Sequence, residues 1–412
     1  MKFLILVAII GAALADESPL KAILKSPLAT LKLYSSFKGE QHLAFQAAED
    51  RLRFRLFRKN AEFVAEENSV EGEMAKFALN FFSTMTESEK QAWLGFNVTG
   101  AELSPQAPSS PMLSASSLPP TKLWTNEDKV TAVKNQGGCG SCWTFGAVGG
   151  LETRYAIKSG VLRNFAEQEY LDCVYEGQRD GCGGGWMNAC YEYSATAGGR
   201  LAKSVDYEYT GRDGYCQGSN KPDGMIAARI KGNVPVRKSE AANVEALAEG
   251  SLAVAFEVTN RFYSYSSGIF KDTSCYSWPN HAVTAVGYTP LYVLVKNSWG
   301  KNWGDQGFVR FARNHHNCNL WNYSSYPELS ETGVADNGGN DEKTDYTADE
   351  EVKPDPDPEC VDVYPPCYEY WCDVDYVRND YCRKTCGVCD ENACPSGTIR
   401  CSDGVCRHEH MC

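Results

Sequence analysis

The stretch Gln136-Gly137-Gly138-Cys139-Gly140-Ser141-Cys142-Trp143 decides how this 412-residue chain folds, because it joins a tight turn to the start of a helix. A helical pattern runs from Cys142 to about Lys158, and Gly160 follows it as a typical helix stop. A cysteine in the first turn of a helix lies among unsatisfied N–H groups at the positive end of the helix dipole, and both favour the thiolate. Cys142 is therefore a candidate nucleophile.

A Cys-x-x-Cys pair also has two non-nucleophilic interpretations, zinc binding and thiol–disulfide exchange. Zinc needs two further ligands, and the nearest candidate pair for such a site is Cys386 and Cys389 near the other end of the chain. The redox interpretation is disfavoured because Trp143 follows the motif instead of preceding it, and no βαβ pattern surrounds it.

The candidate base is His281, one of six histidines. It opens an apolar, strand-like run over 282–288. It follows Cys142 by 139 residues, a separation in the range expected of a nucleophilic cysteine and its histidine. His42 lies in the N-terminal region, and the polar loop 313–317 holds two histidines that are expected to be solvated. The other two, His408 and His410, lie in the tail.

Two amide side chains complete the candidate site. Asn297 ends the strand pattern after that of His281 and could hold the second ring nitrogen, although a buried structural asparagine is the alternative. Trp299 and Trp303 would shield that hydrogen bond from water. The Gln136 side chain, with the Cys142 backbone N–H, could stabilise an oxyanion.

Strand patterns are concentrated after residue 250, at 252–258, 282–288, 291–296 and 308–311. Helices first and strands later predict an α+β architecture in two lobes.

The N-terminal region begins with a Lys2, an apolar run over 3–14 and small residues before Asp16, which predicts a signal peptide over 1–15. Residues 16–117 form the next predicted unit, and its best segment is a stripe at helical spacing. By itself the stripe would fit any amphipathic helix. Its members are Glu49, Arg53, Phe57, Asn60, Val64 and Asn68.

These motifs resemble the papain-like cysteine proteases of the cathepsin L type, whose inhibitory propeptides carry such a stripe on a long helix. The resemblance extends from this stripe to Tyr326. It is carried by 136–143, 167–173, 181–185, 280–283 and 297–300. It implies a papain-like two-lobe fold over 118–328, with a helical lobe and a β-barrel-like lobe. It also implies that the precursor is inactive and that hydrolysis of peptide bonds runs through an acyl-enzyme on Cys142, with His281 as general base and acid.

The resemblance also implies a substrate cleft. Gly184 and Gly185 would present backbone to an extended peptide, and a pocket would select an apolar or aromatic residue at the second position before the scissile bond. No long insertion follows Gly185, which favours an endopeptidase. The other expected substrate-binding residues are Trp186, Met187, Ala255, Ala282 and Trp303.

Eighteen cysteines behind a signal peptide indicate an oxidising compartment. In the protease region the resemblance implies the pairs Cys139–Cys182, Cys173–Cys216 and Cys275–Cys318, which leaves Cys190 as a buried thiol. In the tail, residues 360–389 resemble a ShK toxin-like domain. That resemblance implies the pairs Cys360–Cys389, Cys367–Cys382 and Cys372–Cys386.

The tail accounts for the net charge of −13, because residues 328–412 hold 21 acidic and 7 basic side chains and the rest of the chain holds 32 and 33. Residues 329–359 are predicted to be an acidic disordered linker, and 390–412 a cysteine-rich tail of unassigned fold. A nucleic-acid partner is disfavoured because no basic excess is present.

We therefore expect a secreted or lysosomal monomer that acts on peptides and proteins, is inhibited by its own propeptide, and needs no cofactor or metal. The sequence has no run long enough for a membrane span after the signal peptide. Asn97 and Asn322 are expected glycosylation sites, and the partner of the tail stays open. Two alternatives are a catalytically silent papain-fold binding protein and a toxin-like channel ligand acting through the C-terminal module.

Overall fold

The computed structural model describes residues 19–70, 72–96, 118–174, 181–217, 230–275, 278–315, 317–330 and 340–346, and the backbone of 399–400 and 406–407. Several predictions lie outside these residues: the signal peptide, Asn97, the ShK-like module with its three disulfides, and the tail disulfides. The chain divides into two units, Met1–Ala348 and Asp349–Cys412. In the second unit, the structure describes one antiparallel pair, β10 (Ile399–Arg400) with β11 (Cys406–Arg407).

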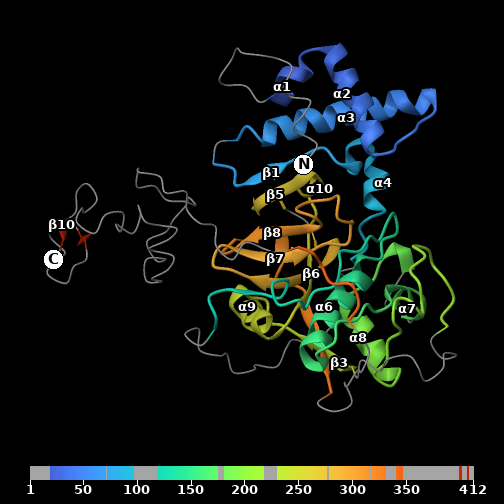
Figure 1. Ribbon diagram of the computed structural model, residues 1–412, viewed down its shortest axis with the longest axis vertical. Coiled ribbons are helices and arrows are strands. Elements are labelled where there is room, and N and C mark those ends of the chain that lie inside the picture. The colour runs from blue at the N-terminus through green and yellow to red at the C-terminus, as the bar shows by residue number, and fades with distance from the viewer. Residues whose placement is uncertain are drawn as a thin grey trace. The chain divides into compact units, whose positions relative to one another are not determined.

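The N-terminal region is helical, as predicted. Helix α1 spans Pro19–Leu24, α2 spans Pro27–Glu40 and α3 spans Ala47–Glu67. Ser26 caps α2 by accepting a hydrogen bond from the Ala29 N–H at 3.3 Å, and Pro27 follows at the first helical position, where no donor is lost. Figure 1 shows these helices at one end of the first unit, next to the strands.

The predicted stripe does lie on one helix, with Asn68 as its C-terminal cap, and it holds the following segments in place. Phe57 and Val64 are buried, while Arg53 binds Glu49 and Glu89. The Asn68 side chain accepts from the Phe77 N–H and donates to its carbonyl oxygen, at 2.9 and 2.8 Å. These contacts fix the three short elements that follow: β1 (Ala75–Phe77), the 3-10 helix η2 (Phe81–Thr84) and α4 (Glu87–Gln91).

The helical lobe is built on α6 (Cys142–Ser159), which Gly160 ends with a φ of 78°. Around it lie α7 (Glu167–Cys173), η4 (Gly181–Gly183) and α8 (Met187–Thr196). The buried helix approaches its neighbours closely at Gly149, where an added Cβ would lie 2.2 Å from the Thr284 hydroxyl oxygen. Glycine at this position lets α6 pack directly on strand β6 of the other lobe.

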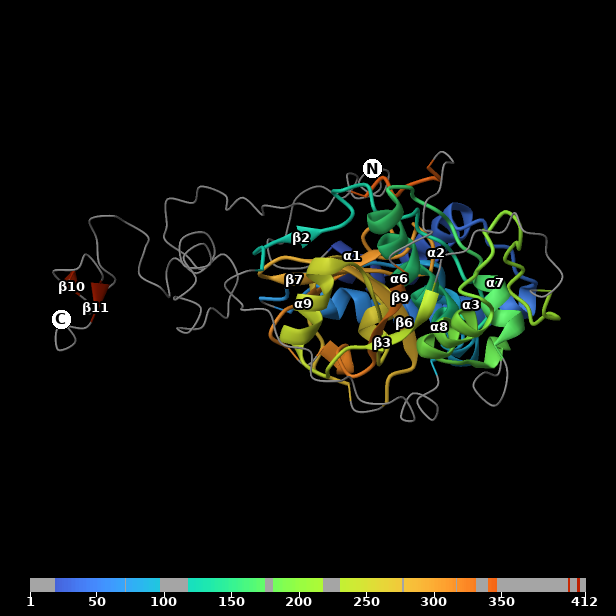
Figure 2. The same ribbon diagram turned by 90° about the horizontal axis from the view of Figure 1, so that it is seen from below.

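The second lobe is a nine-stranded sheet in the order β1-β5-β8-β7-β6-β4-β9-β3, with β2 paired to β6. Strand β1 of the N-terminal region extends this sheet, since Ala75 pairs with Gly268 of β5. Figure 2 shows α7 and α8 on the opposite side of the first unit from β7 and α9. The elements of the lobe are β2 (Lys122–Leu123), β3 (Ile230–Pro235), α9 (Glu240–Glu249), β4 (Leu252–Phe256), α10 (Asn260–Ser264), β5 (Tyr265–Phe270), β6 (His281–Tyr288), β7 (Tyr292–Lys296), β8 (Phe308–Ala312), η6 (Asn317–Asn319) and β9 (Ser324–Leu329).

Three disulfides join Cys139 to Cys182, Cys173 to Cys216 and Cys275 to Cys318, which are the pairs that the resemblance implied. Among the described cysteines, Cys142 and Cys190 are free and buried.

The prediction of a disordered linker over 329–359 is wrong in two places. Strand β9 continues to Leu329, and residues 340–346 pack against both lobes, where Thr344 and Tyr346 are buried. The acidic composition suggested a solvated segment, but the Asp341 carboxylate and the Tyr346 ring have specific partners, which are described below.

Candidate active site

Cys142 and His281 lie together where the two lobes meet. Cys142 is the first residue of α6, and His281 is the first residue of β6. The Cys142 Sγ accepts a hydrogen bond from the Ala282 N–H at 3.4 Å, so the strand that carries His281 directly contacts the sulfur. Both side chains are fully buried.

Asn297 holds the ring of His281 from the other side. The Asn297 Oδ1 lies 2.8 Å from the His281 Nε2, because β6 pairs with β7 and Asn297 directly follows β7. The Nδ1 of His281 is buried and has no hydrogen-bond partner among the described residues, which leaves this nitrogen for the sulfur. Trp299 covers the pair, with its ring centroid 4.7 Å from that of His281. Trp303 lies behind Trp299, at 5.2 Å, fully buried in the barrel core.

Gln136 is held with its amide toward the cleft. Its Oε1 accepts from the Ser298 hydroxyl at 2.7 Å, and its backbone N–H donates to the Ser298 carbonyl at 2.8 Å. Tyr209 donates to the Gln136 carbonyl at 2.8 Å. The Nε2 therefore faces away from these groups, and it donates at 2.9 Å to the carbonyls of Cys139 and Trp93.

The segment 93–96 of the N-terminal region occupies the cleft as a peptide. The Gly185 N–H donates to the Gly95 carbonyl at 2.9 Å. The N–H groups of Gly95 and Phe96 both donate to the Asn280 carbonyl, at 3.1 and 3.0 Å. An added Cβ on Gly95 would lie only 1.7 Å from the carbonyl oxygen of Gly140, so no other residue fits there without displacement of backbone.

The Phe96 side chain is buried in the apolar cluster of the helical lobe and lies against Tyr323, with 5.4 Å between ring centroids. Four of the predicted pocket residues belong to the same cluster: Trp186, Met187, Ala255 and Ala282. Gly184 lies beside Gly95 at the cleft, where its added Cβ would meet the Gly95 carbonyl oxygen at 2.8 Å.

Sequence reasoning missed Asn280 and Tyr323. The contribution of Asn280 comes from its backbone carbonyl, which has no side-chain signature. Tyr323 is one aromatic residue among many, and only the fold brings β9 and the residues before it next to the cleft. Trp303, by contrast, was predicted to bind substrate but supports Trp299 from within the barrel core.

Burial determines the protonation of the pair in this closed form. It raises the pKa of the Cys142 thiol to about 12, although the hydrogen bond from the Ala282 N–H acts to lower this pKa. It lowers the pKa of His281 to about 4, although the hydrogen bond with Asn297 acts to raise this pKa. Both shifts favour the neutral thiol and the neutral imidazole over the thiolate–imidazolium pair in the covered site.

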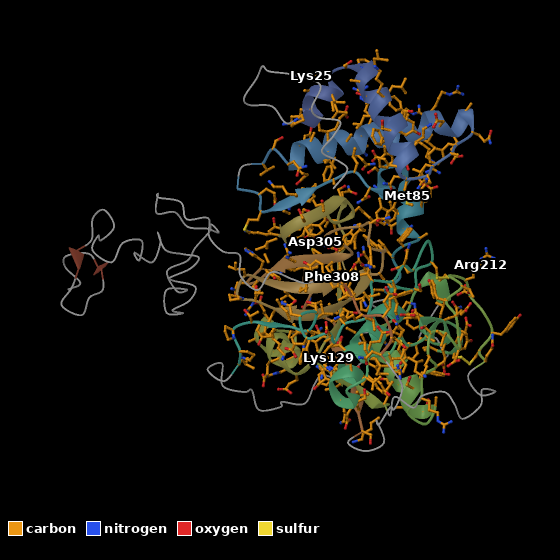
Figure 3. All side chains as sticks on the ribbon, viewed as in Figure 1. Lys25, Met85, Lys129, Arg212, Asp305 and Phe308 are labelled. Atoms are coloured by element: carbon orange, nitrogen blue, oxygen red, sulfur yellow. A yellow bond between two sulfur atoms is a disulfide. The ribbon has the colours of Figure 1, made fainter. Side chains whose placement is uncertain are left out.

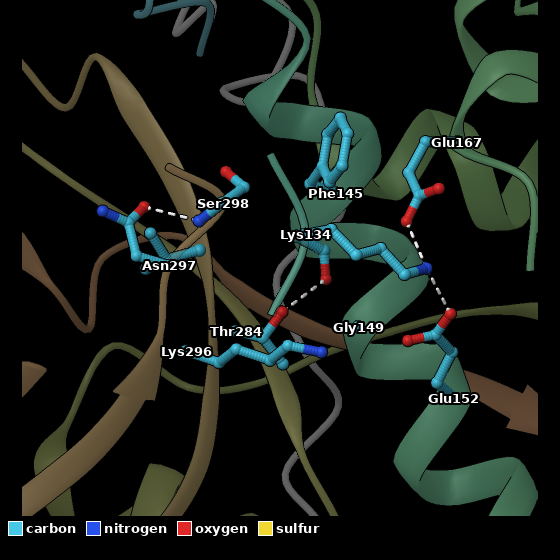
Figure 4. Close-up of a pocket in the computed structure, with 11 residues that line it drawn as sticks. Lys134, Phe145, Gly149, Glu152, Glu167, Thr284, Lys296, Asn297 and Ser298 are labelled. Carbon is cyan, nitrogen blue, oxygen red and sulfur yellow. Dashed lines mark hydrogen bonds and ion pairs between the residues drawn. The ribbon is translucent and has the colours of Figure 1, made fainter. Parts of the chain in front are cut away.

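A buried set of charges lies beneath the site (Figure 4). The Lys134 ammonium binds Glu152 of α6 and Glu167 of α7, both at 2.6 Å. Lys296, next to Asn297, donates to the Thr131 hydroxyl at 2.7 Å, and burial lowers its pKa to about 8. The contacts of Lys134 connect α6 and α7 to the loop that precedes the cleft. The four charged side chains also line a small pocket next to Asn297.

Asn322 of the second predicted glycosylation site is half-buried and donates to the Asn319 side chain at 3.0 Å. None of the described helices is both long and apolar enough to cross a membrane.

The comparisons with known proteins agree with this geometry. Residues 118–328 match the family model described as papain family cysteine protease. Digestive cysteine proteinase 3 of Homarus americanus is 35% identical over 77% of this chain and 97% of its own length. Cathepsin S of Mus musculus is 34% identical over 68% of this chain and 85% of its own. The solved structure of digestive procathepsin L2 from Tenebrio molitor larval midgut has a TM-score of 0.66 at 30% identity, covering 73% of this chain and all of that one.

The fold and the site thus define a thiol protease in a propeptide-covered, zymogen form. The chain belongs to the papain family of cysteine proteases.

Proposed function

We propose that the processed protein is an endopeptidase in which Cys142, His281, Asn297 and Gln136 perform the chemistry. One observation carries the proposal: the chain's own segment 93–96 lies across the cleft and takes hydrogen bonds from the groups that a substrate would need. This arrangement supports the proposal that the cleft binds an extended peptide.

The residues have distinct roles. The Cys142 thiolate attacks the scissile carbonyl carbon, and the oxyanion that forms is stabilised by the Gln136 amide and the Cys142 N–H. The His281 Nδ1, protonated in the ion pair, gives its proton to the leaving amine. It then removes a proton from the water that hydrolyses the thioester, which regenerates the thiol pair. Asn297 fixes the ring so that Nδ1 faces the sulfur.

Phe96 supports the proposed preference for an apolar or aromatic residue at the second position before the scissile bond. The Phe96 N–H donates to the Asn280 carbonyl, the preceding Gly95 carbonyl accepts from the Gly185 N–H, and the Phe96 ring lies against Tyr323. Because this pocket already holds a phenyl ring, a substrate phenylalanine or leucine fits the same space.

Alkylation of Cys142 tests the assignment. A pKa near 12 reduces the thiolate fraction at neutral pH about a thousandfold from that of an ordinary cysteine. We expect iodoacetamide to label Cys142 rapidly at pH 7 in the processed enzyme, with activity lost in proportion to labelling. In the precursor, labelling should be at least about a hundredfold slower and should rise with pH. Mass spectrometry of the labelled peptide locates the site; inactivation without label on Cys142 would contradict the proposal.

Replacing Tyr323 with alanine should weaken selection for an aromatic residue at that position. Aromatic contacts contribute about 0.5–1.5 kcal/mol beyond area burial, so kcat/KM for a phenylalanine substrate should fall about 2- to 12-fold. A valine substrate, which does not reach the ring, should change less than about twofold. Steady-state kinetics on paired fluorogenic peptides measures this, and Tyr215→Ala, at a tyrosine that is 93% exposed, is the control. Equal losses on both substrates would remove Tyr323 from the pocket.

We further propose a secreted or lysosomal location, a monomeric enzyme, and a ShK-like C-terminal module that targets or spaces the enzyme. Oxidised cysteine pairs in the catalytic domain support the first of these. The silent-binder and channel-ligand alternatives are disfavoured because a complete nucleophile, base and orienting amide lie together in the cleft.

A further inference from the structure

Residues 340–346 lie beyond the region that matches the family model, yet they contact both lobes of the catalytic domain. Their backbone runs beside residues 130–132: Thr344 N–H donates to the Val130 carbonyl at 2.9 Å, and the Ala132 N–H donates to the Glu342 carbonyl at 3.3 Å. Thr131 and Lys343 form an antiparallel bridge between these bonds. The segment therefore pairs as a short strand, and we call residues 340–346 the strap.

One end of the strap is bound to the helical lobe, just after α6. The Leu162 N–H donates to the Asn340 side chain at 2.9 Å, and the Asp341 N–H donates to the Leu162 carbonyl at 3.0 Å. The Asp341 carboxylate accepts from the Asn164 N–H at 2.7 Å and lies 3.3 Å from the buried Arg163 guanidinium. A carboxylate with such partners is specifically held, in contrast to the solvated charge that composition suggested.

The other end is anchored in the barrel lobe by Tyr346, which is 3% exposed. Its ring stacks on Phe308 of β8, with 4.3 Å between centroids. Its hydroxyl donates to Asp305 at 3.0 Å and accepts from Arg310 at 2.9 Å, and Arg310 also binds Asp305 at 3.0 Å. Figure 3 labels Asp305 and Phe308, the two loop residues that Tyr346 contacts.

That loop leads directly to the catalytic asparagine. The Asn297 N–H donates to the Gly307 carbonyl at 3.0 Å, and the Gly307 N–H donates to the Trp303 carbonyl at 2.7 Å. Trp303 in turn packs on Trp299, which covers the His281–Asn297 hydrogen bond. Tyr346 contacts the loop on both sides of Gly307, by a hydrogen bond to Asp305 and by stacking on Phe308. Because Gly307 accepts from the Asn297 N–H, these contacts limit where the backbone of Asn297 can lie.

We propose that the strap is an integral part of the catalytic domain, and that Tyr346 is a positioning residue that keeps the loop at 303–308, and through it Asn297, in catalytic register. This inference rests on the proposed role of Asn297. It places the functional end of the enzyme at residue 346, beyond the family match at 328.

The test uses the full chain, expressed as precursor and processed in the same way for each variant. Tyr346→Ala should lower kcat about tenfold with KM changed less than about twofold, because loop position affects the chemical step more than substrate binding. It should also lower the Tm by several degrees. Tyr346→Phe keeps the stack on Phe308 and should recover most of the Tm but only part of kcat. Tyr215→Ala is the matched control and should change neither.

The outcomes separate the possibilities. A lower Tm with unchanged kcat in the folded fraction would show that the strap only stabilises the fold and would overturn the positioning role. Unchanged Tm and kcat in Tyr346→Ala would show that the strap does not dock. Mass spectrometry of the processed enzyme adds a third check, since a fully active enzyme that ends before Asn340 would also overturn the proposal. Failure of the proposed function itself is distinct, because it requires Cys142→Ala to remain active.

Discussion

The processed enzyme with Cys142→Ala is expected to lose peptide hydrolysis by about 10⁴-fold or more, the scale seen when a covalent nucleophile is removed. The physical reason is that no other described thiol or hydroxyl lies where the Ala282 N–H and the His281 ring meet the substrate. Without the sulfur, His281 has no group to activate and no acyl intermediate forms. Hydrolysis of a fluorogenic peptide with an apolar residue at the second position measures the loss.

Cys190→Ala is the matched control, because Cys190 is the second described cysteine that is free and fully buried. It lies on α8 in the apolar cluster of the helical lobe, so its loss should leave a small cavity and lower stability by about 1 kcal/mol. Its kcat should stay within about twofold of wild type. Residual activity in Cys142→Ala that matched Cys190→Ala would refute the nucleophile assignment.

Gly95→Ala in the precursor is expected to produce activity before processing. The new methyl group would lie 1.7 Å from the Gly140 carbonyl oxygen, so the segment at 93–96 must leave the cleft or distort the turn beside Cys142. Displacement breaks the bonds from Gly185 and Asn280 and readmits water to the catalytic pair. Exposure to water then favours the thiolate–imidazolium pair, which burial disfavours.

The rate of the unprocessed Gly95→Ala precursor should rise at least about tenfold above that of the wild-type precursor, since a lost inhibitory contact of 1.4 kcal/mol already gives that factor. Cleavage must be excluded by gel analysis of the same sample. Gly39→Ala is the control, because Gly39 lies on α2 of the same region with no atom within 4 Å of its added Cβ. A precursor with Gly95→Ala that stays silent would mean that inhibition depends on the helical region rather than on the cleft segment.

The inhibitory region combines two kinds of contact with different consequences for such tests. Phe57 and Val64 of α3 and Phe77 of β1 belong to one apolar cluster with residues of the barrel lobe. Strand β1 pairs with β5, and Arg261 binds Glu67 and Glu73 across the same boundary. These contacts hold the region in place. The segment at 93–96 blocks the cleft. A single substitution at Gly95 can therefore open the site while the rest of the region stays bound.

The sequence predicted those features of the site that depend only on local residue spacing. The helical stripe from Glu49 to Asn68 needs only a period near 3.6, and the strand that His281 opens needs only an apolar run between polar turns. Asn297 was predicted because neighbouring strands in sequence commonly pair. Each of these inferences is local, and in each the described element is where the pattern indicated.

Other features depended on contacts between distant segments. Composition predicted that residues 340–346 would be solvated, yet Asp341 and Tyr346 find partners on both lobes, more than 30 residues away in sequence. A carboxylate looks the same in a sequence whether it faces water or a buried arginine, and only the folded chain distinguishes these environments.

By itself the sequence determined the chemistry available to this protein: a thiol at a helix start, an imidazole at a strand start and two amides, each recognisable by residue type and local spacing. The tertiary structure decided the state of that chemistry. Segment 93–96 closes over the cleft, and because burial disfavours charged groups, the pKa values of the thiol and the imidazole shift toward the neutral form of each.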